Sequence, residues 1–114
     1  MRSLIVPLIL LSAATPAMAG ERTGYMSIAA GDLKRAEATL ESARRADPDR
    51  PEVLLNLAAV YQQTGRPEAA RQLYVAVLSA KPLAMDMPSG AVLSSHVVAQ
   101  RGLARLGPTV MAAR

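Results

Sequence analysis

The chain has 114 residues, a net charge of +4 and no cysteine, and Ala and Leu dominate its apolar half. The missing cysteine excludes disulfides, thiolate metal sites, cysteine nucleophiles and a lipid anchor on cysteine. The 13 basic residues are interleaved with nine acidic ones and there are only three aromatic residues. The chain therefore offers neither the basic stripe nor the aromatic platforms that nucleic-acid binding uses.

The first 19 residues predict a secretory signal peptide. Arg2 precedes an apolar run over residues 4–11, and the small-x-small triplet Ala17-Met18-Ala19 follows. This is the order of the charged, apolar and cleavage regions of a signal peptide. The run is shorter than the about 20 apolar residues that a membrane span needs. We expect cleavage after Ala19, no stable membrane span afterwards, and a secreted, periplasmic protein; the alternative is an uncleaved N-terminal anchor.

Two helices are expected next. The first covers about Arg22 to Ala30 and ends at Gly31, since glycine takes positive φ without steric cost. The second covers Leu33 to Ala46, where apolar residues recur every three or four positions. Asp32 is its expected N-cap, and Pro48 stops it because proline cannot continue the hydrogen-bond ladder.

Two further helices are expected from the same kinds of start and stop residues. Asp49 is the expected cap of the third helix, with Glu52 three residues on as in a capping box, and this helix ends at about Thr64. Pro67 suits the first turn of the fourth helix. The residues expected to be buried in this pair of helices are Val53, Leu54, Leu57, Ala58, Tyr61, Ala70, Leu73, Tyr74, Val77 and Leu78.

The last part of the chain predicts a linker and one more helix. Pro88 and Gly90 are typical of a linker, expected over residues 85–90. A helix follows from residue 91 and is ended by Gly107, and residues 108–114 form a tail. Its expected apolar side comprises Val92, Leu93, Val97, Leu103 and Leu106, with Arg101 and Arg105 on the other side.

An internal repeat organises residues 20–84. Shifting the chain against itself by 34 positions places Gly31 on Gly65 and Pro48 on Pro82. The same shift pairs Ala36 with Ala70, Leu40 with Tyr74, Ala43 with Val77 and Ala46 with Ala80. A period of 34 residues is that of the tetratricopeptide repeat (TPR).

The second unit, residues 51–84, resembles the TPR position by position. Leu54 stands where that family usually has Trp, and Leu57-Ala58 stands where it has Leu-Gly. The remaining matches are Tyr61, Gly65 in the turn, the small residue Ala70, Tyr74 at the aromatic position, Val77 in place of Ala, and Pro82. The first unit, residues 20–48, matches only in its second half and is degenerate. The resemblance implies an all-α fold of antiparallel helical hairpins stacked as a short solenoid, with helix 91–107 as a C-terminal cap.

The resemblance also implies a non-catalytic module that binds a protein or peptide in a groove lined by the first helix of each hairpin. The candidate groove residues are Tyr25, Ile28, Glu52, Leu55, Asn56, Ala59, Gln62 and Gln63. Leu55 is expected to be exposed, because Leu54 and Leu57 already supply the core stripe, and could anchor a peptide. The alternative is an ordinary solvated helix face. The family's carboxylate clamp is absent, since Asn56 lacks the accompanying basic residues.

No set of residues indicates catalysis, a metal or a cofactor. His96 is the sole histidine, and the neighbouring Ser94 and Ser95 lack the positioned acid that a catalytic triad needs. The glycines stand singly, so no phosphate-binding loop is formed. Two repeats fall below the usual three for independent stability. The alternative to a protein-binding adaptor is therefore a structural subunit or homo-oligomer that is stable only when assembled.

Overall fold

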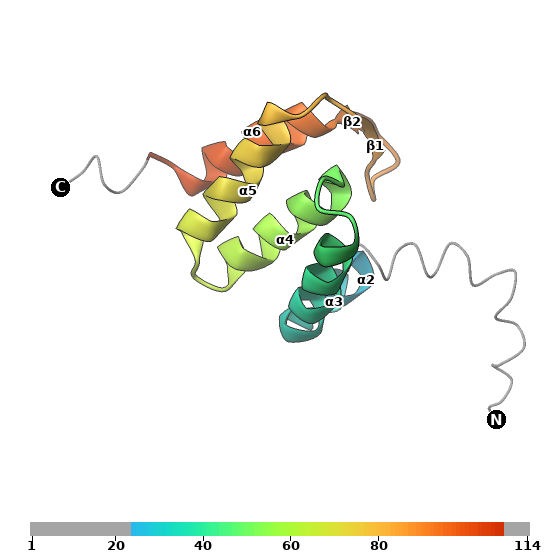
Figure 1. Cartoon of the computed structure of the whole chain (residues 1–114), viewed down its shortest axis with the longest axis vertical. Helices are drawn as coiled ribbons and strands as arrows, with labels where there is room; N and C mark the ends of the chain where they lie inside the picture. Colours follow the sequence, from blue (N-terminus) through green and yellow to red (C-terminus); the bar gives the residue numbers. More distant parts are fainter. Residues whose placement is uncertain (1–23, 109–114) are drawn as a thin grey trace, which may run out of the picture.

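The computed structural model describes residues 24–108, a stack of helices with one small hairpin (Figure 1). The leader at residues 1–19 and the tail at 109–114 lie outside the described residues. The elements are α2 (Tyr25–Ala29), α3 (Leu33–Ala46), α4 (Pro51–Gln63), α5 (Pro67–Ser79), β1 (Ala84–Asp86), β2 (Val92–Ser94) and α6 (Ser95–Leu106). Consecutive helices pack on one another, and α6 contacts both α5 and α4. The predicted stack of helical hairpins with a C-terminal helix over its last repeat is confirmed.

The predicted cap of α3 and the predicted glycine turns after α2 and α4 are confirmed. The Asp32 carboxylate accepts a hydrogen bond from the backbone N–H of Arg35 at 3.1 Å, so Asp32 caps α3. Gly31 and Gly65 follow α2 and α4 with φ of +82° and +77°. Residues with a side chain rarely adopt this conformation, which explains why glycine recurs in both turns.

The start of α4 differs from the prediction. Its N-cap is Arg50 and no side chain caps it, so the expected capping box with Asp49 is wrong. Pro51 is the first residue of the helix, where its missing N–H leaves one less donor to satisfy. Glu52 accepts a hydrogen bond from Arg50 Nε at 3.4 Å instead of reaching back to a cap.

The core lies around α4, the central helix. α4 contacts α3, α5 and α6, and the fully covered residues come from all four helices. These residues are Ala36, Leu40, Val53, Leu54, Leu55, Leu57, Ala58, Val60, Ala70, Leu73, Tyr74, Val77 and Ala99. Tyr61 and Leu78, which were expected to be buried, are only partly covered and pack at the edge of this core. The short side chains of Ala58 and Ala70 allow α4 and α5 to approach closely.

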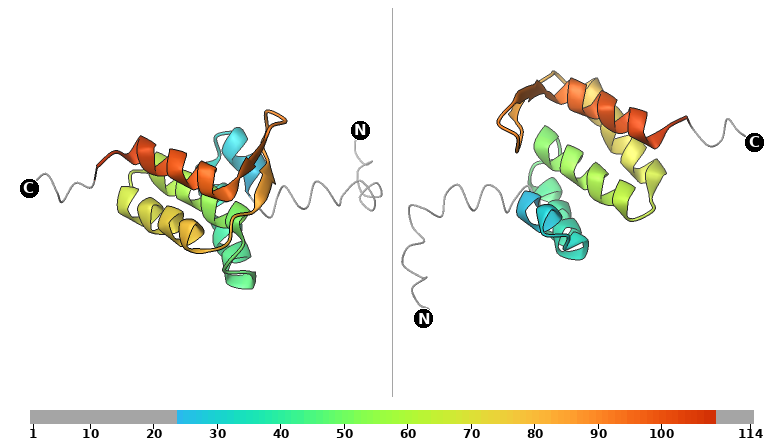
Figure 2. Two further views of the ribbon diagram at one scale, coloured as in Figure 1. Left: turned by 90° about the horizontal axis from the view of Figure 1, so that it is seen from above. Right: turned by 180° about the vertical axis from the view of Figure 1, so that it is seen from behind.

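A β-hairpin spans residues 84–94, which were predicted as a linker over 85–90 and as the start of the last helix from residue 91. β1 and β2 pair antiparallel, with Ala84 opposite Ser94, Met85 opposite Leu93 and Asp86 opposite Val92. Met87 N–H donates to the Ala91 carbonyl, and Gly90 N–H donates to the Met87 carbonyl, both at 2.8 Å. Pro88 and Gly90 therefore belong to a tight turn, in which Gly90 takes a φ of +92°. Figure 2 shows the hairpin projecting from the end of the helix stack where α6 begins.

Hydrogen bonds attach this hairpin to α6. Leu83 N–H donates to the Ser95 hydroxyl at 2.9 Å, and Ser95 N–H donates to the Leu83 carbonyl at 2.8 Å. His96 Nε2 lies 2.7 Å from the carbonyl oxygen of Ala80, to which it donates. The single histidine thus has a structural contact that ties the end of α5 to the start of α6.

α6 buries a different side from the one predicted. It begins at Ser95, because the Ser94 hydroxyl caps it by accepting a hydrogen bond from His96 N–H at 3.1 Å. The residues that face inward are Ser95, Ala99 and Gly102, while Val92 lies in β2 and is 62% exposed. Leu103 and Leu106 pack against the core as expected. Because Gly102 has no side chain, α6 lies close against Tyr74 of α5.

Candidate functional site

Leu55, expected to be the exposed anchor of the groove, belongs to the core instead. It is only 5% exposed. Val53, Leu54 and Leu55 are all buried, and three successive residues span about 200° of a helix. α4 is covered over this wide sector because it has three helical neighbours. The prediction was wrong because it assumed that α4 packs against a single helix and so needs only one apolar stripe.

Among the other candidate groove residues, Ile28 and Gln62 contact the rest of the fold, whereas four residues of α4 form a line on its surface. Ile28 packs half-buried against the core, and Gln62 Oε1 accepts a hydrogen bond from the Tyr74 hydroxyl at 3.0 Å. Tyr25 begins α2, but its side chain is not among those that the structure describes. Glu52, Asn56 and Ala59 are half-buried, and Gln63 is exposed. These last four recur along α4 at intervals of four, three and four, which places them in one line on a helix surface; we call this line the α4 stripe.

A polar cluster on the opposite side of α4 from this stripe joins the two hairpins. The Tyr61 hydroxyl of α4 donates a hydrogen bond to Glu41 of α3. Arg66, in the turn after α4, donates to Glu37 of α3 at 3.0 Å, and its guanidinium lies 4.6 Å from the centre of the Tyr61 ring. Burial, followed by the hydrogen bond to Glu41, raises the pKa of Tyr61 to about 12. The hydrogen bond from Arg66 lowers the pKa of Glu37.

The pair of Glu37 and Arg66 predicts an acid dependence of stability. The folded-state pKa of Glu37 lies below the ordinary value of 4.5, so the stabilisation is fully present above pH 4.5 and is lost as the pH falls through the folded-state pKa. Glu37→Gln is therefore expected to lower the urea midpoint at pH 7, and the difference from wild type should shrink below pH 4.5. Urea titrations at several pH values measure this. In an Arg66→Gln background the same substitution should have almost no effect; an equal effect there would contradict the pairing.

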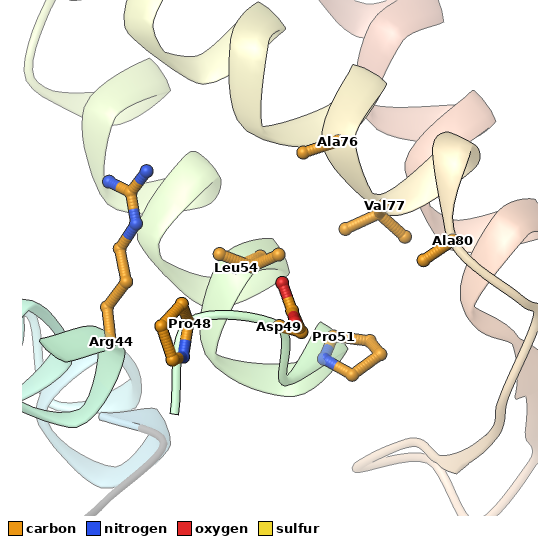
Figure 3. A pocket seen from close by; sticks show the side chains of 8 residues that line it. All are labelled: Arg44, Pro48, Asp49, Pro51, Leu54, Ala76, Val77 and Ala80. Atoms are coloured by element: carbon orange, nitrogen blue, oxygen red, sulfur yellow. The ribbon is translucent and has the colours of Figure 1, made fainter. Parts of the chain in front are cut away.

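A pocket lies on another side of α4. Its volume is about 290 Å³, and it opens between the C-terminal parts of α3 and α5 (Figure 3). The lining residues are Arg44, Pro48, Asp49, Pro51, Leu54, Ala76, Val77 and Ala80. This pocket was not predicted from the sequence. The sequence signal for this pocket was Leu54, which is smaller than the Trp that the TPR pattern usually has there.

The described residues contain no site for metal chemistry. Within residues 24–108, no three His, Asp or Glu side chains gather closely enough to hold a metal ion. His96 is engaged with a backbone carbonyl. No helix in the same range is long and apolar enough to cross a membrane. What these residues present to their surroundings is a helix surface and a shallow pocket.

Comparison with known proteins gives one match. A family model described as tetratricopeptide repeat matches residues 27–85, more than half of the chain. The matched segment runs from α2 to β1 and so contains both helical hairpins. No curated protein and no solved structure matches the chain.

Proposed function

This chain belongs to the tetratricopeptide repeat family, and on that premise we propose that it is an adaptor of the cell envelope that binds a peptide or helix of a partner protein. TPR repeats generally mediate protein–protein interaction, so the chain is an interaction module, and the family is typically non-catalytic. The envelope location rests on the signal-peptide pattern of residues 1–19, with cleavage after Ala19.

The observation that carries the proposal is the α4 stripe. Glu52, Asn56 and Ala59 are half-buried and Gln63 is exposed, so the stripe keeps accessible surface along the length of the central helix. The buried residues of α4 lie outside this stripe. The small side chain of Ala59 near the middle of the stripe leaves room for a partner's backbone or side chain. The exposed amide of Gln63 supplies hydrogen-bonding groups at the C-terminal end of the stripe. Such a surface suits a helix or extended segment laid along α4.

Crosslinked pull-down from the periplasm tests this proposal. The bait is the tagged chain as the cell exports it, and its intact mass shows whether the protein begins at Gly20. Ala59→Arg places a long charged side chain in the middle of the stripe, and Gln63→Arg does so at its exposed end. We expect wild type to capture a partner and both variants to lose at least about ten-fold of it, as for an interface residue worth about 1.4 kcal/mol.

The matched control introduces the same charge on a different helix. Gln72 of α5 is exposed, so Gln72→Arg should capture the partner as wild type does. Circular dichroism melts verify that all three variants are folded. Capture that survives both stripe substitutions would remove the α4 stripe as the binding surface. Recovery of only the chain itself would favour the structural subunit or homo-oligomer instead.

A further inference from the structure

We propose that the pocket over Leu54 is a second binding site, which takes one bulky apolar side chain from a partner segment that carries an acidic residue and a basic residue nearby. At 100° per residue, Leu54 lies about 200° around α4 from Glu52. The pocket therefore opens on the side of α4 away from the α4 stripe, and the two surfaces do not compete for space.

The walls of the pocket are apolar and short. Leu54 of α4 lies between the other lining residues, and α5 with its C-cap contributes Ala76, Val77 and Ala80. A volume of about 290 Å³ lies just below the range for ligand sites, about 300–1,000 Å³, and so suits a side chain better than a whole cofactor. An aromatic or leucine side chain placed there would exchange part of its contact with water for contact with these walls.

The pocket is formed before anything binds. Two of its lining residues are Pro48, in the connection from α3 to α4, and Pro51, the first residue of α4, and proline fixes the backbone φ. The α5 wall consists of alanine and valine, which have few rotamers to lose on binding. The cavity exists because Leu54 is smaller than the Trp expected at this repeat position. A partner side chain can fill the space that the chain's own residue leaves empty.

Two charges flank the pocket and specify the chemistry of the occupant. Figure 3 shows Arg44 of α3 on one side of Leu54 and Asp49 on the other. Within residues 24–108, neither side chain makes a hydrogen bond or an ion pair. Arginine binds carboxylates with two parallel hydrogen bonds, and opposite charges across an interface set register and orientation. The complementary partner therefore places an acid beside Arg44 and a base beside Asp49.

The probe for this proposal is a set of labelled helix-forming peptides of about 15 residues. Each has one central Phe, Trp or Leu, with Glu one turn before it and Lys one turn after it. We expect saturable binding to the full chain as it is produced, with amide NMR shifts at Ala76, Val77 and Ala80. Replacing the central residue of the peptide by Ala should weaken binding about ten-fold or more. Failure of all three peptides to bind overturns the proposal.

Substitutions in the protein distinguish this pocket from other surfaces. Leu54→Trp fills the pocket with a residue that the repeat accommodates and should remove binding. Ala80→Leu narrows the pocket from an exposed position, so it tests the same point without changing the core. Arg44→Glu should weaken binding about ten-fold, and a peptide with Lys in place of Glu should restore it. Arg45→Glu, the exposed neighbour that does not line the pocket, is the matched control and should bind normally.

Two further outcomes overturn the proposal. One is unchanged affinity in both Leu54→Trp and Ala80→Leu; the other is NMR shifts that map to Ala59 and Gln63. The Ala59→Arg variant of the α4 stripe should bind these peptides as wild type does. The pocket and the α4 stripe can therefore succeed or fail separately.

Discussion

The variant Gly102→Leu is expected to melt several degrees, up to about 15 °C, below wild type. A Cβ atom at position 102 would lie 2.3 Å from Cζ of Tyr74 and 2.4 Å from its Cε1. Tyr74 cannot yield easily, because it is 2% exposed and its hydroxyl donates to Gln62. Overpacking costs about 1–3 kcal/mol or more, and a domain of this size loses about 4–8 °C per kcal/mol. The better helix propensity of Leu, about 1 kcal/mol, offsets only part of this cost.

A double-mutant cycle isolates the contact between Gly102 and Tyr74. Gly102→Ala should be destabilising in wild type but neutral or slightly stabilising in a Tyr74→Leu background, where the ring is gone. Gln100→Leu adds the same side chain at an exposed position of α6 and should leave the melting temperature nearly unchanged. Calorimetry or circular dichroism measures all of these variants. A Gly102→Leu protein that melts like wild type would show that α6 does not pack on Tyr74 in solution.

The four helices of the two repeats could be predicted because their boundaries depend on local chemistry. Gly31 and Gly65 stand where the backbone needs positive φ, and Asp32 supplies the cap of α3. Pro67 occupies the first turn of α5, where its missing N–H costs nothing. These effects act within a few residues of each other, so the sequence alone contains them.

The buried side of α6 could not be predicted from a pattern of large apolar residues. Its inward positions are Ser95, Ala99 and Gly102, and at Gly102 the Tyr74 ring leaves no space for a side chain. Their spacing of four and three residues was a signal, but it becomes meaningful only when the neighbour across the interface is known. The β-hairpin was missed for a related reason, since strands of three residues are shorter than any window over which alternation can be read.

The α4 stripe and the pocket over Leu54 also depend on tertiary packing, which a single sequence does not contain. Leu55 was expected at the surface, but the number of helices that cover α4 is a tertiary property. Leu54, where the repeat usually has Trp, hinted at unfilled space, but a pocket forms there only because α3 and α5 supply its walls, which is again a tertiary property. Because the α4 stripe and the pocket lie on different sides of α4, an adaptor that used both would hold two partner segments at once. Binding to one surface would not block the other.

Ala70→Trp is expected to unfold the domain or to drive it into dimers. Ala70 is fully buried on α5, where that helix meets α4. An indole there would force the two helices apart and expose the side chains between them. The cost should reach about 3 kcal/mol or more, a large part of the about 4–13 kcal/mol that stabilises 85 residues. Exposed apolar surface would then be covered either by collapse or by a second copy.

Melting curves at several concentrations, together with light scattering, separate these two outcomes of Ala70→Trp. A dimer gains stability by mass action, so its melting temperature should rise with protein concentration, whereas an unfolded monomer shows no cooperative transition. Gln72→Trp carries the same indole at an exposed position of α5 and should melt as a monomer close to wild type. A monomeric Ala70→Trp protein with an unchanged melt would mean that α4 and α5 are not held in close contact. In that case, the wall that α5 provides for the pocket over Leu54 would also lack a fixed position.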